Sequence, residues 1–316
     1  MNTKNKITTF LALCAGGATA TALLNQYIKV TAISRRLITS EESLCYRWRL
    51  GAVYYTKKGT GKPLLLIHDL NFASSGQEWS QLVDRISQNY TVYTLDLLGC
   101  GRSEKPNLTY TNYLFVQLLT DFVKSEIGHR TNLIASGESS SFSVMACCQS
   151  PELFDRILLI NPSSLSDCAQ IPGKNSKLYK LILDLPIVGT LLCNIAGSRK
   201  MITEKFQKEY YYNPYAVKAA LVDAYYEAAH LGDYPKALFS SLECLYTKCN
   251  ITNALKKIDN SIFIAGGSEE PSIEDIIAEY RKHNSAVEFS LIPKTKHLPQ
   301  LEDPAKLMEL IEVFFA

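Results

Sequence analysis

Short runs of apolar residues recur along the chain and alternate with segments whose apolar positions have helical spacing. Apolar runs of this length are typical of strands buried on both faces of a parallel sheet. Their alternation with helices predicts an α/β fold with a doubly wound, mostly parallel sheet. The predicted strands are Leu64–Ile67, Tyr93–Leu95, Leu133–Ile134, Ile157–Ile160, Ile262–Ala265 and Val287–Ile292, after a hairpin over 43–56, and the predicted helices are Trp79–Ile86, Tyr113–Ile127, Ile273–Lys282 and Ala305–Phe315.

The alternation stops between Ser163 and Asp259, where the spacing is helical and no strand is predicted. A segment of this length is too long for a loop, and we therefore predict an inserted helical cap. The predicted organisation is an N-terminal segment over 1–36, a first part of the core over 37–162, the cap over 163–259 and a second part of the core over 260–316.

The N-terminal segment has no charged residue from Ile7 to Ile28. Such a stretch is just long enough to cross a bilayer, which favours a hydrophobic helix that anchors the chain in a membrane by a single span. Two alternatives remain open: a signal peptide cleaved near Ala18-Thr19-Ala20, after which the protein is secreted, and a soluble amphipathic helix. Positive charges at Lys29, Arg35 and Arg36 follow the stretch, so we expect the main domain in the cytoplasm.

Composition narrows the partners of the chain. The 316 residues carry a formal net charge of +2, which implies no nucleic-acid partner, and an apolar content of 47% is ample for a buried core. The nine cysteines form no C-x-x-C pair and no zinc-like spacing, as expected in a reducing compartment. Neither a metal nor a cofactor is predicted.

Five segments at or near the ends of predicted strands carry recognisable motifs. Together they resemble the α/β-hydrolase superfamily, in its capped haloperoxidase- and esterase-like branch, and the resemblance covers roughly Cys45 to the C-terminus. It implies the α/β-hydrolase fold. The segments are Leu65–Asp69, the glycine-punctuated turn Asp96–Ser103, the strand–turn–helix Thr131–Pro151, Gly267–Pro271 and Ile292–Pro299.

In that family the strand–turn–helix presents the attacking side chain on a sharp turn between two small residues. The small positions here are Ala135 and Ser139, and Gly137 stands between them where a serine is expected. A shifted register places Ser139 in the role, but two residues deeper into the helix, and Ser136 is a second alternate. Many family members have a proline-led turn about four helical turns after the nucleophile, and counting back from Pro151 leads to Gly137.

The resemblance also assigns the rest of the catalytic machinery. Glu270 would be the acid of the triad and His297 the general base. The backbone N–H groups of Leu70 and Glu138 would form the oxyanion hole, in which fixed donors meet developing negative charge. The nucleophile alone would be missing, with an empty corner at Gly137.

These assignments imply a membrane-anchored hydrolase of a small apolar ester or acyl compound, with a degenerate triad. Without the usual serine, either Ser136 or Ser139 attacks from a new position, or His297 activates a water in the vacated space. The alternative is a non-catalytic relative that binds an apolar ligand or a partner protein.

Overall fold

The structure is a computed structural model that describes residues 3–38 and 43–316. For residues 3–11, 13 and 14 it describes the course of the helix but not the side chains. Several side chains of the predicted membrane span, with that of Cys14, therefore lie outside the description.

Eight strands form one sheet in the order β1-β2-β4-β3-β5-β6-β7-β8. The pairs β1–β2 and β2–β4 are antiparallel, and every other neighbouring pair is parallel. The prediction of a doubly wound, mostly parallel sheet is confirmed. The strands are β1 Leu44–Trp48, β2 Gly51–Lys58, β3 Lys62–Ile67, β4 Tyr90–Leu95, β5 Thr131–Ser136, β6 Phe154–Ile160, β7 Ile262–Gly267 and β8 Glu288–Ile292.

Helices cover both faces of this sheet, as the strand β3 shows. Leu64 and Leu66 pack in a cluster with residues of α2 and α14, whereas Leu65 and Ile67 pack in a second cluster with residues of α3, α4 and α12. The wholly apolar strand predicted from the sequence is thus buried from both sides. The core helices are α2 Val83–Ile86, α3 Asn112–Phe122, α4 Ser139–Gln149, α5 Leu165–Cys168, α11 Thr252–Lys257, α12 Ile273–His283, α13 Pro299–Glu302 and α14 Pro304–Phe315.

Two helices in the structure differ in detail from the helices that the sequence predicts. The segment Trp79–Ile86 is not one helix: a 3₁₀ turn, η1 (Gly76–Trp79), and α2 are separate, because the buried Trp79, Leu82 and Ile86 reach one cluster without a continuous helix. The helix predicted to end at Ile127 closes with a π-turn over Val123–Ile127.

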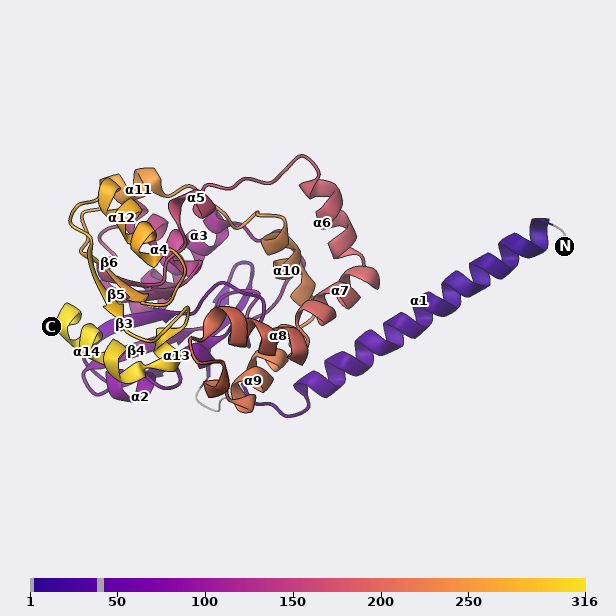
Figure 1. The fold of residues 1–316 in the computed structure, drawn as a ribbon, viewed down its shortest axis with the longest axis horizontal. Helices are drawn as coiled ribbons and strands as arrows, with labels where there is room; N and C mark the ends of the chain where they lie inside the picture. Colours follow the sequence, from indigo (N-terminus) through magenta and orange to yellow (C-terminus); the bar gives the residue numbers. More distant parts are fainter. Residues whose placement is uncertain (1–2, 39–42) are drawn as a thin grey trace.

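Helices α6 to α10 form a cap beside the sheet (Figure 1). The flanking helices α5 and α11 pack on α12 and α4, with the core. The predicted division of the chain at 163 and 259 stays a prediction. The cap elements are α6 Ser176–Asp184, α7 Val188–Ala196, α8 Arg199–Lys205, a π-turn η3 Phe206–Tyr210, a 3₁₀ turn η4 Pro214–Ala216, α9 Ala219–His230 and α10 Pro235–Glu243.

The N-terminal helix α1 spans Thr3–Ile33. Its C-terminal part packs on the cap helices α7 and α9, and its N-terminal part extends away from the rest of the protein (Figure 1). Asn25 fixes the contact: its Nδ2 donates to the carbonyl of Ile187, and its Oδ1 accepts from Asn194. Over the described residues, no single helix has the length and apolar character to cross a membrane. Among these residues, the helices α6 and α7 together have the required length and composition, but they are bent by 92° relative to each other.

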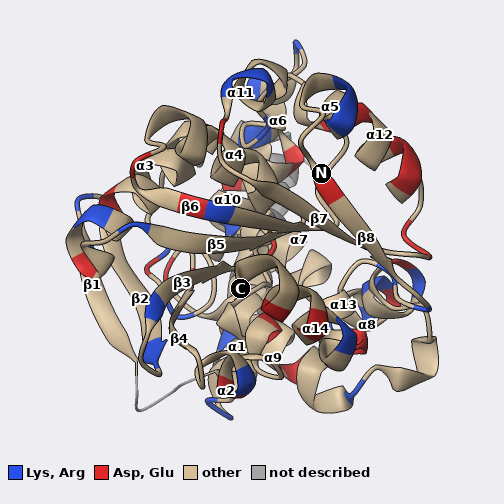
Figure 2. Cartoon of the chain, turned by 90° about the vertical axis from the view of Figure 1, so that its left-hand side faces the viewer, with Lys and Arg blue, Asp and Glu red and all other residues tan. Residues whose placement is uncertain are grey.

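Charged residues are distributed without a dominant sign. Figure 2 shows basic and acidic positions interspersed over the elements that face the viewer. Neither sign of charge therefore predominates among the elements that face the viewer.

Candidate active site

The turn between β5 and α4 has the sharp backbone that the sequence predicts. Gly137 follows the last residue of β5, adopts a φ of +54° and donates its N–H to the carbonyl of Ile160. Glycine adopts this left-handed conformation without the strain that a side chain brings. The helix α4 then begins at Ser139.

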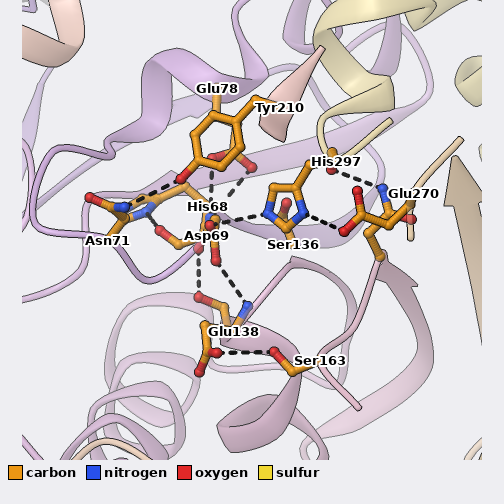
Figure 3. A network of polar contacts seen from close by, with 12 residues as sticks. His68, Asp69, Asn71, Glu78, Ser136, Glu138, Ser163, Tyr210, Glu270 and His297 are labelled. Carbon is orange, nitrogen blue, oxygen red and sulfur yellow. Dashed lines mark hydrogen bonds and ion pairs between the residues drawn. The ribbon is translucent and has the colours of Figure 1, made fainter. Parts of the chain in front are cut away.

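The corner above Gly137 is filled by the carboxylate of Asp69, and the prediction of an empty corner is wrong. A Cβ atom added to Gly137 would lie 2.3 Å from Asp69 Oδ1 and 2.6 Å from Asp69 Cγ. Asp69 reaches this position from the loop that follows β3, because a glycine at 137 leaves the space free (Figure 3).

Asp69 also accepts a hydrogen bond from one of the two N–H groups that were predicted to form the oxyanion hole. The N–H of Glu138 donates to Asp69 Oδ1 at 2.9 Å, so it already has an anionic acceptor within the protein. The predicted hole at Leu70 and Glu138 is therefore not open as expected, since one of its two donors is engaged. The other oxygen, Oδ2, lies 3.4 Å from Nε2 of His297.

The structure brings the predicted base and acid together. Nδ1 of His297 lies 3.3 Å from Oε1 of Glu270, so the imidazole stands between two carboxylates (Figure 3). Asn161, at the end of β6, holds both loops in place: its Nδ2 donates to the carbonyls of Lys296 and His297, and its Oδ1 accepts the N–H of Gly267. No sequence motif marks Asn161 for this role.

The two carboxylates determine the charge of the imidazole. Burial lowers the pKa of His297, but its hydrogen bonds to Asp69 and Glu270 outweigh that effect and raise the pKa to about 10. For Asp69, burial opposes ionisation, yet the hydrogen bond and charge of His297 bring the pKa below its usual value. At neutral pH the site therefore holds an imidazolium that is paired with the ionised Asp69.

This ion cluster makes stability depend on pH. The pKa of His297 is higher in the folded chain than the ordinary value near 6.5, so its contribution is complete below about pH 6.5 and is lost as pH rises through about 10. We expect the native protein to have a larger free energy of unfolding than His297→Gln at pH 6. This difference should become smaller by about 1–3 kcal/mol between pH 6 and pH 10. Urea denaturation over that range measures the difference. His129→Gln, on an exposed loop, is the control, and a pH-independent difference for His297→Gln would contradict the ion cluster.

The two alternate serines lie outside the corner. Ser139 donates its hydroxyl to the carbonyl of His68 at 2.6 Å, and Ser136 accepts from Nε2 of Gln300 at 3.0 Å. Both hydroxyls are buried and engaged away from His297. Neither position offers a replacement for the missing nucleophile.

A third acidic side chain, that of Glu78, lies beneath Asp69. Glu78 is fully buried, accepts the backbone N–H of Asp69 at 3.1 Å and accepts from Gln300 at 2.7 Å. Burial is the main cause that raises the pKa of Glu78 to about 7, and the negative charge of Asp69 adds to it. Its hydrogen bond fixes the backbone from which the Asp69 side chain rises.

Two cavities meet at Tyr210. The entrance cavity, about 330 Å³, opens onto Asp69, Glu270 and His297, and the cap cavity, about 310 Å³, lies beneath the cap. The Tyr210 ring stacks on His297 with centroids 5.0 Å apart, and its hydroxyl accepts from Asn71. The cap cavity is lined by apolar side chains, among them Phe72, Ala73, Ala196, Ile202, Phe206 and Phe239, and also by the charged side chains of Glu204, Lys205, Lys208, Glu209 and Glu243.

Comparisons with known proteins agree with this architecture. The sequence model of the Alpha/beta hydrolase family matches residues 64–310. An uncharacterized protein of Mycobacterium tuberculosis (strain ATCC 25618 / H37Rv) is 26% identical over 135 residues, 41% of this chain and 39% of that protein. This chain thus spans about two fifths of the length of the first curated relatives it matches.

Two further similarities extend over nearly the whole length of the other protein. A soluble epoxide hydrolase of Corynebacterium sp. (strain C12) is 21% identical over 300 residues, 88% of this chain and 98% of that enzyme. The crystal structure of a membrane phospholipase A, described as a bacterial virulence factor, superposes with a TM-score of 0.68 at 18% identity, over 99% of this chain and 98% of that one. With the family match covering most of the sequence, the chain belongs to the alpha/beta hydrolase family.

Proposed function

We propose that this protein is a hydrolase of small apolar epoxides and that the Asp69 carboxylate is its nucleophile. The observation that carries the proposal is the position of Asp69, whose carboxylate fills the corner where the elbow side chain of the family stands. One oxygen is held by the N–H of Glu138 and the other faces His297. The similarity to a soluble epoxide hydrolase supports the substrate class.

An ester suits this site less well than the sequence suggested. The Glu138 N–H would have to leave Asp69 before it could stabilise the oxyanion of an acyl intermediate. Attack of a carboxylate on an ester gives an anhydride, whereas attack on a strained ring carbon gives a stable ester. The ionised carboxylate therefore favours an sp³ electrophile.

In the first step, Asp69 Oδ2 bonds to a ring carbon and the carbon–oxygen bond of the epoxide breaks. The released oxygen takes a proton from Tyr210, which burial keeps protonated by raising its pKa. Asp69 is now a neutral ester, so His297 loses one of the two charges that raise its pKa. The imidazolium then gives a proton to solvent and becomes a neutral base, while the Tyr210 phenolate takes a proton from solvent.

In the second step, His297 takes a proton from a water that attacks Cγ of the Asp69 ester. The Glu138 N–H stabilises the oxyanion that forms on Oδ1, and the Cγ–Oδ2 bond then breaks. The diol leaves with Oδ2 as its new hydroxyl oxygen and takes the proton of the carboxylic acid formed at Cγ. Asp69 is again a carboxylate, now with an oxygen from water, and His297 is again an imidazolium.

Oxygen isotopes test this path. With enzyme in excess over styrene oxide in H₂¹⁸O, the diol of the first turnover should carry no ¹⁸O, because its new oxygen comes from Asp69. Mass spectrometry should find ¹⁸O in the proteolytic peptide that contains Asp69. A first-turnover diol labelled with ¹⁸O, with an unlabelled peptide, would show that water attacks the substrate directly.

A second candidate is a binding protein without turnover. It is favoured by the closed arrangement of the site, in which the predicted base is an imidazolium and Asp69 occupies an oxyanion donor. Native protein that turns over neither epoxides nor p-nitrophenyl esters, yet binds an apolar ligand in the cap cavity by calorimetry, would support this candidate over the first.

We also propose that α1 holds the protein at a membrane, with the main domain on the cytoplasmic side. Its uncharged stretch and the extension of its N-terminal part away from the domain support the anchor (Figure 1). The positive charges of Lys29, Arg35 and Arg36 after the stretch favour the cytoplasmic side. The similar fold of a membrane phospholipase A, over almost the whole chain, is consistent with it.

A further inference from the structure

Helix α6 carries its apolar side outward. Leu178, Leu181 and Ile182 recur at helical spacing and Leu185 caps the C-terminus of the helix; all four are exposed, with 62% of Leu181 accessible to solvent. A helix on the surface of a globular domain ordinarily turns such a stripe toward the core. The apolar side of α6 therefore has no covering element within the part of the chain that the structure describes.

The polar side of α6 faces the protein instead. Nζ of Lys180 donates to the Ser240 hydroxyl of α10 at 3.1 Å, and that hydroxyl donates to Asp184 at 2.7 Å. Lys236 donates to the carbonyls of Asp184 and Leu185. These bonds fix the helix with its apolar stripe pointing away from the cap.

The exposed stripe continues onto the neighbouring helices. Helix α7 packs against both α6 and α1, and all three lie at the end of the molecule away from the C-terminus (Figure 1). Helix α1 also has exposed apolar side chains, among them Leu23, Leu24 and Tyr27, which belong to its uncharged stretch. We name the cap apolar surface by its exposed residues Leu178, Leu181, Ile182, Leu185, Val188 and Leu192.

We propose that the cap apolar surface lies on a lipid bilayer, with its side chains among the acyl chains next to the headgroups. Apolar patches of this kind mark sites of protein or membrane contact. The rim of the surface carries the exposed Lys174 and Lys177, and Asp184 is tied inward, so the surface presents positive charge suited to anionic headgroups. A second copy of the chain would present the same lysines and repel them.

Brominated lipids test the contact at a chosen residue. The full-length chain has two tryptophans, so subtraction of the native signal isolates the emission of Leu181→Trp. On vesicles of phosphatidylcholine and phosphatidylglycerol, bromine on the acyl chains should reduce that emission roughly twofold, because interfacial helices bury their apolar face about 5–10 Å deep. The matched control is Val313→Trp, on the exposed side of α14 at the opposite end of the molecule, whose emission should not change.

Each other outcome overturns the proposal in a different way. Vesicle-bound protein in which bromine leaves the Leu181→Trp emission unchanged would show attachment through α1 alone, with the cap away from the lipid. Protein that does not bind vesicles would remove the membrane anchor as well. A blue shift of Leu181→Trp that grows with protein concentration and ignores bromine would assign the surface to a second copy.

Discussion

Asp69→Asn should abolish the hydrolysis of apolar epoxides, with kcat/KM falling at least about 1,000-fold. The amide has nearly the size of the carboxylate and still accepts the N–H of Glu138, so the corner stays filled. It lacks the negative charge and the nucleophilic oxygen that form the ester. Steady-state rates on styrene oxide and on a longer aliphatic epoxide measure the effect.

A surface carboxylate provides the comparison for this variant. Asp84→Asn changes an exposed residue that pairs with Lys58 far from the site, and it should leave kcat/KM unchanged. Thermal unfolding of both variants shows whether lost activity reflects lost structure. Full activity in a folded Asp69→Asn protein would remove Asp69 as the nucleophile.

Gly137→Ser alone should not create a serine hydrolase, although the family carries a serine at this position. The new Cβ would lie 2.3 Å from Asp69 Oδ1, and the left-handed backbone adds strain for any side chain. We expect the free energy of unfolding to fall by about 1–3 kcal/mol. We also expect that a fluorophosphonate probe does not label the variant. Displaced from its corner, the Asp69 carboxylate would still compete for the Glu138 N–H.

Combining that change with Asp69→Gly should produce the reactive serine. The second substitution removes the carboxylate, frees the Glu138 N–H for an oxyanion and leaves His297 paired with Glu270 alone. We expect fluorophosphonate labelling and turnover of p-nitrophenyl esters about 100- to 10,000-fold above the uncatalysed rate. Asp69→Gly by itself is the control, since it opens the corner without supplying a hydroxyl. Equal labelling of Gly137→Ser and the double variant would show that Asp69 does not block the site.

The sheet could be predicted because an apolar run such as Leu64–Ile67 is stable in few places other than between two layers of helices. The pairing of His297 with Glu270 was expected from the order of the family's motifs. The position of Asp69 was not, because comparing motifs one at a time does not reveal that one side chain fills the volume left by another. A signal was present: an acid stands where the family has glycine, and a glycine stands where it has the nucleophile.

Other features depend on the packing of elements far apart in the sequence. The helical spacing of α6 predicts a helix but not which side faces the protein, which is decided by Ser240 and Lys236 on another helix. Asn161 adopts a positive φ at the end of β6 and joins two loops that the sequence presents separately. No local pattern marks such a residue in advance.

The close fit of Asp69 over Gly137 has an evolutionary consequence. A chain that acquires the serine first gains a steric conflict, and one that loses the carboxylate first gains an unfilled hole with no attacking group. Each single substitution toward a serine at position 137 is therefore a loss, and selection acting on one substitution at a time would oppose it. A glycine at 137 and an aspartate at 69 thus depend on each other, and both would have to change together before a serine could be accommodated.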